Sequence, residues 1–328
     1  MRRLRIPIWA RLAAVVVVTI AVAAGCSSSG SGSADTAAAS GTGNTVNSTW
    51  PTSVVYGAVG ESNATSLLQT LAPLQKLLQA KMDVKLNVVT GTSYSAMIEA
   101  QEAGKAQIVS YGPFSYYIAT NHGLKIQNVG ILTDAPNTNG AYYSEAVVDP
   151  QRTPDITSIK DVAGKKTCFS DPASTSGYLY PSYGLLKAGV SPTTGVTAVF
   201  AGSDSTAPLN VAKGSCQVGF TNNLSLPEIF TQNHVPQSDI KIVWKSPKIP
   251  GNPIAASDAL PASLRSAIEN LLVNDANSNY FAAHGYCSSV SACTTLTGQW
   301  GYASPSVANY SQIAEVCKIT NSPSCKLS

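Results

Sequence analysis

The chain carries little charge, and its only basic excess lies at the N-terminus. Its 328 residues include 21 Lys and Arg against 18 Asp and Glu. Four of the basic residues are arginines within the first 11 positions, so 17 basic residues remain against 18 acidic ones. Nucleic-acid binding requires a basic face. We therefore expect no nucleic-acid partner.

No apolar run in the N-terminal region is long enough to cross a membrane comfortably. The run Leu12–Ala24 has 13 residues, whereas a transmembrane helix needs about 20. It follows Arg2, Arg3, Arg5 and Arg11 and ends in Ala24-Gly25. A basic start, a short apolar core and small residues at its end are typical of a secretory signal. We predict a signal peptide over residues 1–25.

The residue after this signal is Cys26, and small residues directly before a Cys resemble a bacterial lipobox. That resemblance implies that Cys26 is lipidated and holds the exported protein on the outer face of the cell membrane through its lipid. An ordinary signal with a nearby Cys is the alternative. Residues 27–48 are nearly all Ser, Gly, Ala, Thr and Asn, and cannot bury enough apolar surface to fold. We predict a flexible tether over residues 26–50.

Metal-binding spacings are missing as well. The sequence has no C-x-x-C and three histidines, so we expect no metal site and no cofactor. An even number of cysteines follows Cys26, which favours disulfides in an exported chain. Local spacing suggests Cys287–Cys293 and Cys317–Cys325, and leaves Cys168 with Cys216, although other pairings remain open.

Short β-rich runs alternate with helical stretches, which is typical of the α/β class. Leucines at positions 67, 68, 71, 74, 77 and 78 form a helical stripe over residues 66–80. The roughly 280 residues after the tether are enough for two lobes with a core each. Strands are expected at 54–57, 84–89, 107–110, 129–132, 142–148, 196–200, 217–220 and 240–244, a turn and strand at 164–169, and helices at 95–103, 113–120, 177–187, 207–213 and 264–277.

Three loops place small and hydroxyl residues before a predicted helix: Gly60–Thr65, Tyr111–Tyr116 and Asp171–Tyr178. Free N–H groups and the positive end of the helix dipole bind anions there. Ser, Thr and Asn are also ordinary helix caps, and one capping residue suffices. The run Ser174-Thr175-Ser176 exceeds that need, so we expect it to bind a ligand. The first loop remains open between capping and binding.

Four segments, 91–100, 111–116, 171–178 and 246–253, resemble the phosphate/phosphite/phosphonate-binding component of ABC importers. The resemblance implies a type II periplasmic-binding fold, in which two α/β lobes with mixed sheets are joined by two crossing strands. Lobe one would comprise residues 51–146 and 253–328, and lobe two residues 147–252. The ligand would lie between the lobes, in contact with Tyr94, Ser115 and Tyr116 from lobe one and Ser174, Thr175 and Ser176 from lobe two.

The sequence departs from that family at three places. Ser203 stands where phosphite and phosphonate binders commonly have His, and amides such as Asn222 and Asn252 stand where acidic residues are often found. These changes disfavour an aminoalkyl ligand. Asp204 remains, and a carboxylate accepts hydrogen bonds only, so it would select a ligand oxygen that carries a proton. Capping of the following helix is an equally good role for Asp204. We include Ser203 and Asp204 in the predicted site.

The resemblance predicts a monomeric binding lipoprotein that captures a small phosphorus oxyanion and delivers it to the permease of an ABC importer, without catalysis. Two alternatives remain on the same sequence. One is a sensor or interaction lipoprotein with the same fold. The other is a secreted hydrolase that uses one of the serines, although the G-x-S-x-G motif is absent.

Overall fold

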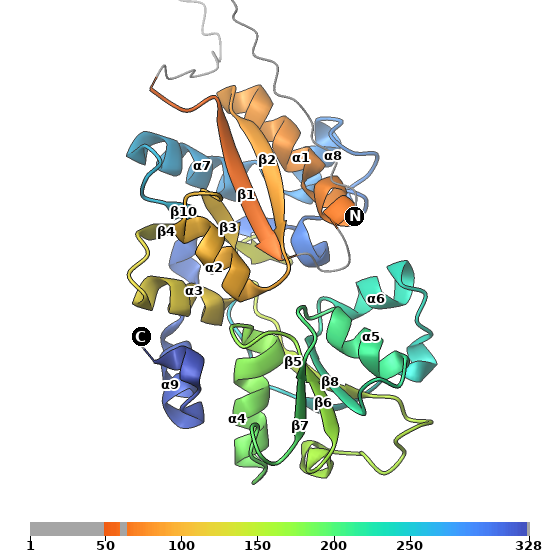
Figure 1. Cartoon of the computed structure of the whole chain (residues 1–328). Helices are drawn as coiled ribbons and strands as arrows, with labels where there is room; N and C mark the ends of the chain where they lie inside the picture. Colours follow the sequence, from red (N-terminus) through yellow and green to blue (C-terminus); the bar gives the residue numbers. More distant parts are fainter. Residues whose placement is uncertain (1–48, 60–63, 327–328) are drawn as a thin grey trace, which may run out of the picture. The chain divides into compact units, whose positions relative to one another are not determined.

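The computed structural model describes residues 49–59 and 64–326 (Figure 1). The predicted signal, Cys26, most of the predicted tether and the loop residues 60–63 lie outside this part of the chain. Within it, the strands form two mixed sheets. No helix of the described residues combines the length and apolar character needed to cross a membrane, and the same residues contain no cluster of His, Cys, Asp and Glu that could hold a metal ion.

The first sheet has the strand order β11-β4-β10-β3-β1-β2. Strand β1 pairs in parallel with β2 and β3, whereas β10 is antiparallel to both of its neighbours, β3 and β4. The bounds are Ser53–Val59 for β1, Lys85–Gly91 for β2, Ile108–Ser110 for β3, Ile126–Thr133 for β4, Pro253–Ser257 for β10 and Gly301–Ala303 for β11.

Helices cover both faces of this sheet (Figure 1). The predicted leucine stripe lies on α1, where five of its six leucines are buried against one face together with α7 and α8, while Leu68 is exposed. Helices α2 and α3 pack on the other face. The bounds are Ala64–Met82 for α1, Tyr94–Glu102 for α2, Pro113–Asn121 for α3, Ala262–Asn274 for α7 and Ser278–Ala283 for α8.

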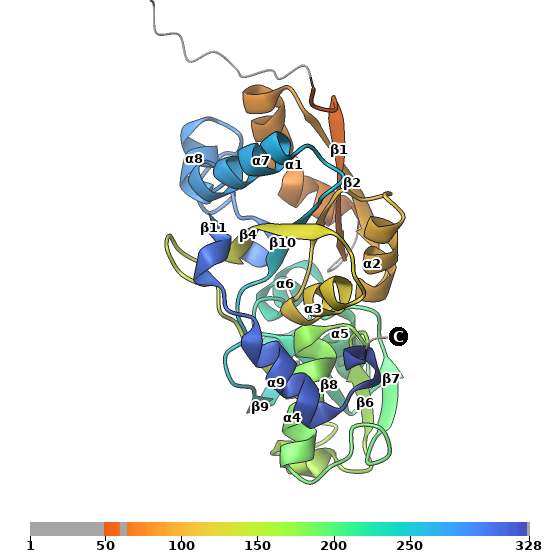
Figure 2. The same cartoon turned by 90° about the vertical axis from the view of Figure 1, so that its left-hand side faces the viewer.

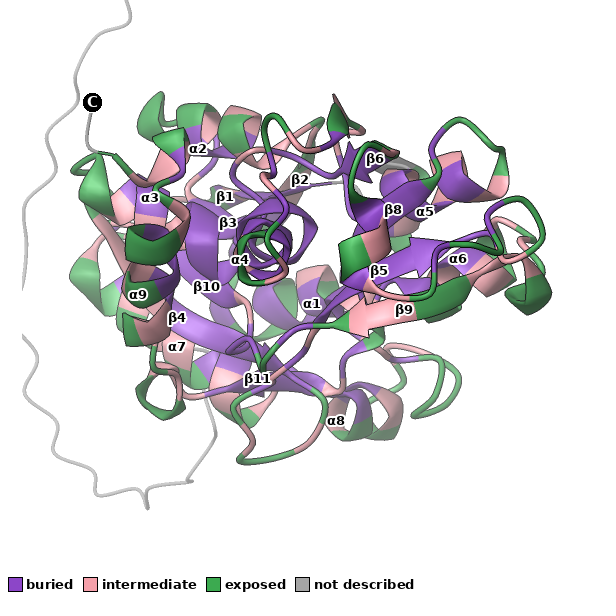
Figure 3. Ribbon diagram, turned by 90° about the horizontal axis from the view of Figure 1, so that it is seen from below, coloured by how far each residue is buried: buried purple, intermediate pink, exposed green. Residues whose placement is uncertain are grey.

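The second sheet has the order β7-β6-β8-β5-β9. Strand β6 is parallel to β7 and β8, and β5 is antiparallel to β8 and β9. Figure 3 shows β5, β6 and β8 largely buried. The bounds are Ser144–Val148 for β5, Lys166–Phe169 for β6, Thr197–Phe200 for β7, Val218–Asn222 for β8 and Lys241–Lys245 for β9, with helices Tyr180–Lys187 (α4), Thr206–Ala212 (α5) and Leu226–Gln232 (α6).

Two connections run between the sheets, residues 134–143 from β4 to β5 and residues 246–252 from β9 to β10. They pair with each other at one antiparallel bridge, where Tyr142 and Ile249 exchange backbone hydrogen bonds of 2.9 and 2.8 Å. Strand β5 lies wholly in the second sheet and begins at Ser144. This is three residues before residue 147, where the sequence analysis expected lobe two to begin. This arrangement is the expected α/β architecture of two lobes joined by two crossing segments.

The C-terminal part belongs to both lobes. Strands β10 and β11 lie in the first sheet, and helices α7 and α8 pack against it. Helix α9 (Ser311–Thr320) instead contacts α3 of lobe one and α4 of lobe two (Figure 2). Ile313 and Val316 of α9 share one apolar cluster with Phe114 of lobe one and Leu179 of lobe two. The assignment of all residues 253–328 to lobe one therefore misses this bridging helix.

Three disulfides are formed, and their pairs are those that the local spacing suggested. Cys168–Cys216 lies in lobe two, Cys287–Cys293 follows α8, and Cys317–Cys325 ties the end of α9 to the last described turn. Each disulfide of this kind typically stabilises a fold by about 2–4 kcal/mol.

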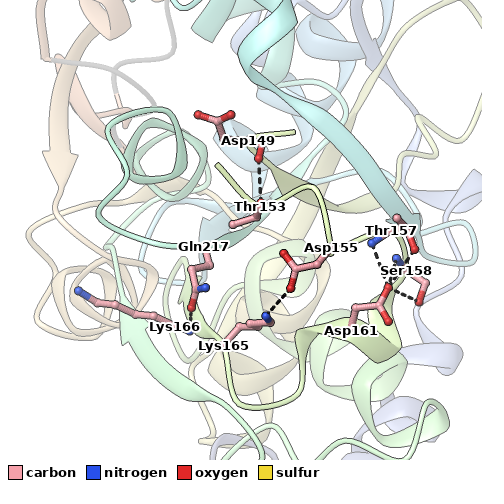
Figure 4. A network of polar contacts seen from close by, with 9 residues as sticks. All are labelled: Asp149, Thr153, Asp155, Thr157, Ser158, Asp161, Lys165, Lys166 and Gln217. Atoms are coloured by element: carbon pink, nitrogen blue, oxygen red, sulfur yellow. Dashed lines mark hydrogen bonds and ion pairs between the residues drawn. The ribbon is translucent and has the colours of Figure 1, made fainter. Parts of the chain in front are cut away.

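A polar network orders the long link between β5 and β6 (Figure 4). The Asp161 carboxylate accepts hydrogen bonds from the backbone N–H groups of Thr157 and Ser158, both at 2.9 Å, and thereby caps a 3₁₀ turn. Lys165 contacts Asp155 at 2.7 Å. These contacts join residues within the link and hold it against the start of β6.

Candidate ligand-binding site

The carboxyl ends of parallel strands meet at one edge of each sheet. In lobe two, Ser170 follows β6, Asp204 follows β7, and Asn222 ends β8. In lobe one, the ends of β1, β2 and β3 lead to Val59, Tyr94 and Gly112. Ligands of α/β proteins bind at this edge, where loops leave the sheet.

The Asp204 carboxylate lies at the centre of the lobe-two edge. It is 3% exposed, and four hydroxyl groups donate hydrogen bonds to it. Tyr94 comes from α2 of lobe one, and its bond to Oδ2 spans the cleft between the lobes. We call Asp204 and its four donors the Asp204 hub: Ser170 Oγ at 2.5 Å, Ser174 Oγ at 3.1 Å, Ser176 Oγ at 3.5 Å and Tyr94 Oη at 3.1 Å.

Burial raises the pKa of Asp204 above its ordinary value, and the hydrogen bonds from Ser170, Tyr94, Ser174 and Asn222 oppose this shift. Two neighbouring titratable groups respond to the same surroundings. The pKa of Asp171 is raised, first by burial and then by the Asp204 charge. The pKa of Tyr142 is also raised by burial and by Asp204. Asp204 therefore binds a proton more readily than an exposed aspartate does.

The three consecutive hydroxyl residues have three different tasks. Ser174 Oγ caps a π-helical turn over Thr175–Leu179 by accepting from Gly177 N–H at 2.9 Å, while its own proton goes to Asp204. Thr175 Oγ1 accepts from Phe114 N–H across the cleft at 2.8 Å. Ser176 faces Asp204. All three side chains are buried.

Gly112 brings the two lobes into contact at the start of α3. A Cβ atom at this position would lie 2.7 Å from Thr175 Oγ1. Gly177 has a similar role inside lobe two, because a Cβ there would overlap the hydroxyl of Ser170 and lie 2.5 Å from Asp204 Oδ1. The absence of side chains at both positions lets the hub and the α3 N-terminus approach each other.

A small cavity of about 30 Å³ lies beside the hub on the lobe-one side. We call it the cleft cavity. The Tyr94 side chain takes part in both. Asn252, in the second crossing segment, also lines it, and its Oδ1 atom is buried without a hydrogen-bond partner. The lining residues are Ala58, Val59, Tyr94, Ser110, Tyr111, Gly112, Leu132, Asn252, Leu296 and Thr297.

Three predicted site residues have other partners in this structure. Ser115 is buried, and its hydroxyl donates to the Gly112 carbonyl within the first turn of α3. Ser203 contacts Thr206 Oγ1 at 2.8 Å and accepts from Thr206 N–H, so it caps α5 and leaves Asp204 free for the hub. The predicted contact of Tyr116 with the ligand stays a prediction: in this structure its ring lies 5.9 Å from that of Tyr310.

Sequence reasoning missed Ser170 and Tyr142. The sequence could have identified Ser170 as a site residue, because it is the first residue after a buried strand and directly precedes the Asp171 loop. Tyr142 lies in the first crossing segment and contacts the side chains of Thr175 and Ser176. No local pattern marks it, because its role arises where the crossing segment meets the lobe-two loop.

The hydroxyl groups of the Asp204 hub donate hydrogen bonds to the Asp204 carboxylate and not to the imidazole of a histidine. Among the described histidines, His122 ends α3, His284 ends α8, and His234 follows α6. Among the described residues, the hydrogen bonds from the hydroxyl groups of Ser170, Ser174 and Ser176 to Asp204 involve none of these histidines. The geometry therefore provides an array of hydrogen-bond donors and acceptors suited to an oxygen-rich ligand.

Comparison with known proteins agrees with this arrangement. The family model described as "ABC transporter, phosphonate, periplasmic substrate-binding protein" matches residues 56–288. The phosphate-import protein PhnD of Mycolicibacterium smegmatis is 29% identical over 291 residues, covering 86% of this chain and 90% of that protein. The phosphonates-binding periplasmic protein of Escherichia coli is 26% identical over 224 residues, covering 67% of this chain and 65% of that protein.

Solved structures share the fold at low sequence identity. PhnD1 from Prochlorococcus marinus, in complex with methylphosphonate, has a TM-score of 0.67 and 19% identity, covering 83% of this chain and 99% of that one. A binding protein component of an ABC phosphonate transporter from Pseudomonas aeruginosa has the same TM-score and identity, covering 83% and 88%. The chain belongs to the phosphonate-type periplasmic substrate-binding proteins of ABC transporters.

Proposed function

We propose that the cleft binds a small phosphorus oxyanion, namely phosphate, phosphite or a simple phosphonate, and delivers it to the permease of an ABC importer. The observation that carries the proposal is the convergence of hydroxyl donors from both lobes on one buried point, the Asp204 hub. Hydroxyl groups that donate hydrogen bonds to a buried carboxylate have the geometry to donate hydrogen bonds to the oxygens of another anion.

The ligand binds by exchange of hydrogen bonds. Hydroxyl groups rotate freely, so Tyr94 and Ser174 can turn their protons from Asp204 to ligand oxygens. A ligand with a P–OH group then donates its proton to Asp204, which keeps the buried carboxylate paired. Sulfate has no proton at neutral pH. It would take the donors and leave an unpaired acceptor facing it, which is costly in a buried site.

The affinity rests on neutral groups. Within the part of the chain that the structure describes, no Lys, Arg or His is among the contacts of the hub or the lining of the cleft cavity. Salt screens mainly exposed charges, so binding should depend only weakly on ionic strength. Hydrogen bonds to a charged group contribute about 1.5–3 kcal/mol each, which is enough for a site built from several of them.

The setting of the protein in the cell completes the proposal. The signal over residues 1–25 and lipidation of Cys26 place the protein on the outer face of the cell membrane, with residues 26–50 as a tether. It acts as a monomer, as expected for a carrier that meets a permease. A transport assay in a deletion strain separates this role from a sensor on the same fold, because only a transport component restores uptake of the oxyanion.

The binding test compares three anions on two variants. Calorimetric titration should detect phosphate and methylphosphonate on the full chain, with sulfate weaker by about tenfold or more. Asp204→Asn should weaken the binding of phosphate and reduce the difference between the affinities for phosphate and sulfate. The reason is that an amide donates a hydrogen bond as well as accepting one. Asp83→Asn, at an exposed position after α1, is the matched control and should bind like the wild type.

Two outcomes would contradict the proposal. If neither phosphate nor methylphosphonate bound the wild-type protein, the ligand class would be wrong. If both bound but Asp204→Asn left every affinity unchanged, the ligand would lie away from the hub.

A further inference from the structure

The cleft cavity has a wall that does not belong to the hub. Its described lining includes no charged side chain. Ala58, Val59 and Leu132 give it an apolar side, and Leu296 and Thr297 close it from the C-terminal part of the chain. A ligand group that enters this space is therefore small and uncharged.

One polar atom in this wall has no partner. Asn252 Oδ1 is buried and accepts no hydrogen bond. The backbone carbonyl of Asn252 accepts from Leu132 N–H at 2.9 Å, which fixes the residue beside β4. A buried carbonyl oxygen without a donor is unfavourable, so a ligand that brings a donor to this point gains binding free energy.

Three hydroxyl groups of the wall donate to other partners. Tyr94 Oη donates to Asp204, Tyr111 Oη donates to Gln101 Oε1 at 2.9 Å, and Thr297 Oγ1 donates to the Leu296 carbonyl at 2.7 Å. Asn252 Oδ1 differs from them as a buried carbonyl acceptor without a donor.

We propose that the cleft cavity is the subsite for the organic substituent of a phosphonate, and that it selects a one-carbon substituent carrying a hydroxyl group. This inference rests on the proposed function, which places the phosphoryl group at the Asp204 hub. A volume of about 30 Å³ has room for about two heavy atoms, since a water molecule needs about 10–15 Å³. A hydroxymethyl group has two heavy atoms and offers its O–H to Asn252 Oδ1.

Other substituents fit less well. A methyl group fills part of the space but leaves Asn252 Oδ1 unpaired. An ammonium group would lose its hydration shell beside described wall residues that include no carboxylate, and a ligand carboxylate would place a second acceptor against the Asn252 carbonyl. The expected order of affinity is hydroxymethylphosphonate above methylphosphonate, with aminomethylphosphonate below both.

The test is calorimetric titration of the full chain with methylphosphonate, hydroxymethylphosphonate and aminomethylphosphonate. The wild type should bind the hydroxymethyl compound about three- to tenfold more tightly than the methyl compound, the range expected for one neutral hydrogen bond. Asn252→Leu removes the acceptor at similar volume and should abolish this preference. Asn252→Asp keeps an acceptor and adds a charge, so it should retain the preference and raise the affinity for the aminomethyl compound.

A control variant and thermal melts separate loss of the subsite from loss of the fold. Asn274→Leu changes an exposed residue of α7 and should keep the wild-type order. The two Asn252 variants check each other, because Asn252→Asp has the shape of the native side chain and remains informative if Asn252→Leu does not fold.

The outcomes also separate this inference from the proposed function. If methylphosphonate and phosphate bind but the hydroxymethyl compound is no better than the methyl one, the subsite is wrong and the proposed function stands. Equal preferences in the wild type and Asn252→Leu would overturn the role of Asn252. If no phosphorus oxyanion binds at all, the proposed function itself fails.

Discussion

Gly112→Ala tests whether closure of the two lobes at the start of α3 is needed for binding. Gly112 has φ −75° and ψ 158°, a backbone conformation that alanine adopts without strain. The added Cβ would lie 2.7 Å from Thr175 Oγ1, whereas ordinary contacts begin at 3.4 Å. The lobe-two loop must therefore retreat by about 0.7 Å.

The magnitude follows from the hydrogen bond beside this contact. Phe114 N–H donates to Thr175 Oγ1 at 2.8 Å, and both groups are buried. If the loop retreats, the N–H loses its partner, which costs about 1–3 kcal/mol. In the proposed ligand-bound state the two lobes are in contact at this point, so the dissociation constant should rise about 5- to 150-fold.

Calorimetric titration with phosphate and methylphosphonate measures this effect. Gly130→Ala is the matched control, because its Cβ would meet Leu272 Cδ1 at an ordinary 3.4 Å inside lobe one. Thr175→Val removes the hydrogen-bond acceptor Oγ1 without adding an atom at position 112, and it should weaken ligand binding by a similar factor. The reasoning fails if Gly112→Ala folds normally and binds both ligands as tightly as the wild type.

Three further predictions concern pH, lipidation and disulfides. Because burial raises the folded-state pKa of Asp204, its stabilising contribution is complete below the pKa of an unfolded aspartate and is lost as pH rises through the folded value. Urea melts across this range should show a smaller pH dependence for Asp204→Asn than for Asp83→Asn, and equal curves would contradict the assignment. Cys26→Ala should leave the protein unprocessed or release it from the membrane fraction, and unchanged membrane retention would refute lipidation. Thiol titration of the denatured, unreduced protein should find no reactive cysteine among the six after Cys26, and a positive reaction would show that a predicted disulfide is missing.

Elements with a local signal could be predicted from the sequence. The leucine stripe identified α1 because most of its apolar residues face one sheet. Strand β10 had no such signal: Pro253-Ile-Ala-Ala-Ser is short and lacks alternation, and it becomes a strand because β3 and β4 lie on its two sides. Its pairing depends on residues more than 100 positions away in the sequence, which a local pattern cannot encode.

The site followed the same rule. The sequence predicts a candidate location, because hydroxyl residues and glycines gather where parallel strands end. The task of each side chain was not predictable. Ser174, Thr175 and Ser176 looked equivalent in the sequence, but the π-helical turn directs Thr175 to lobe one and the two serines to Asp204. Tyr116 follows the buried Ser115 on α3, and the helical turn directs its side chain towards Tyr310.

The C-terminal part of the chain sets the chemistry that distinguishes this site. The family match ends at residue 288, yet Leu296 and Thr297 wall the cleft cavity. Thr297 has φ 54°, a left-handed conformation that is unusual for a threonine. The Cys287–Cys293 disulfide precedes it, and Thr295 bonds to Gln299 across the turn at 2.8 Å. A turn anchored in this way gives the cavity a fixed wall. In the proposed binding mode the hub holds the oxyanion, and this C-terminal wall limits which substituent the ligand carries.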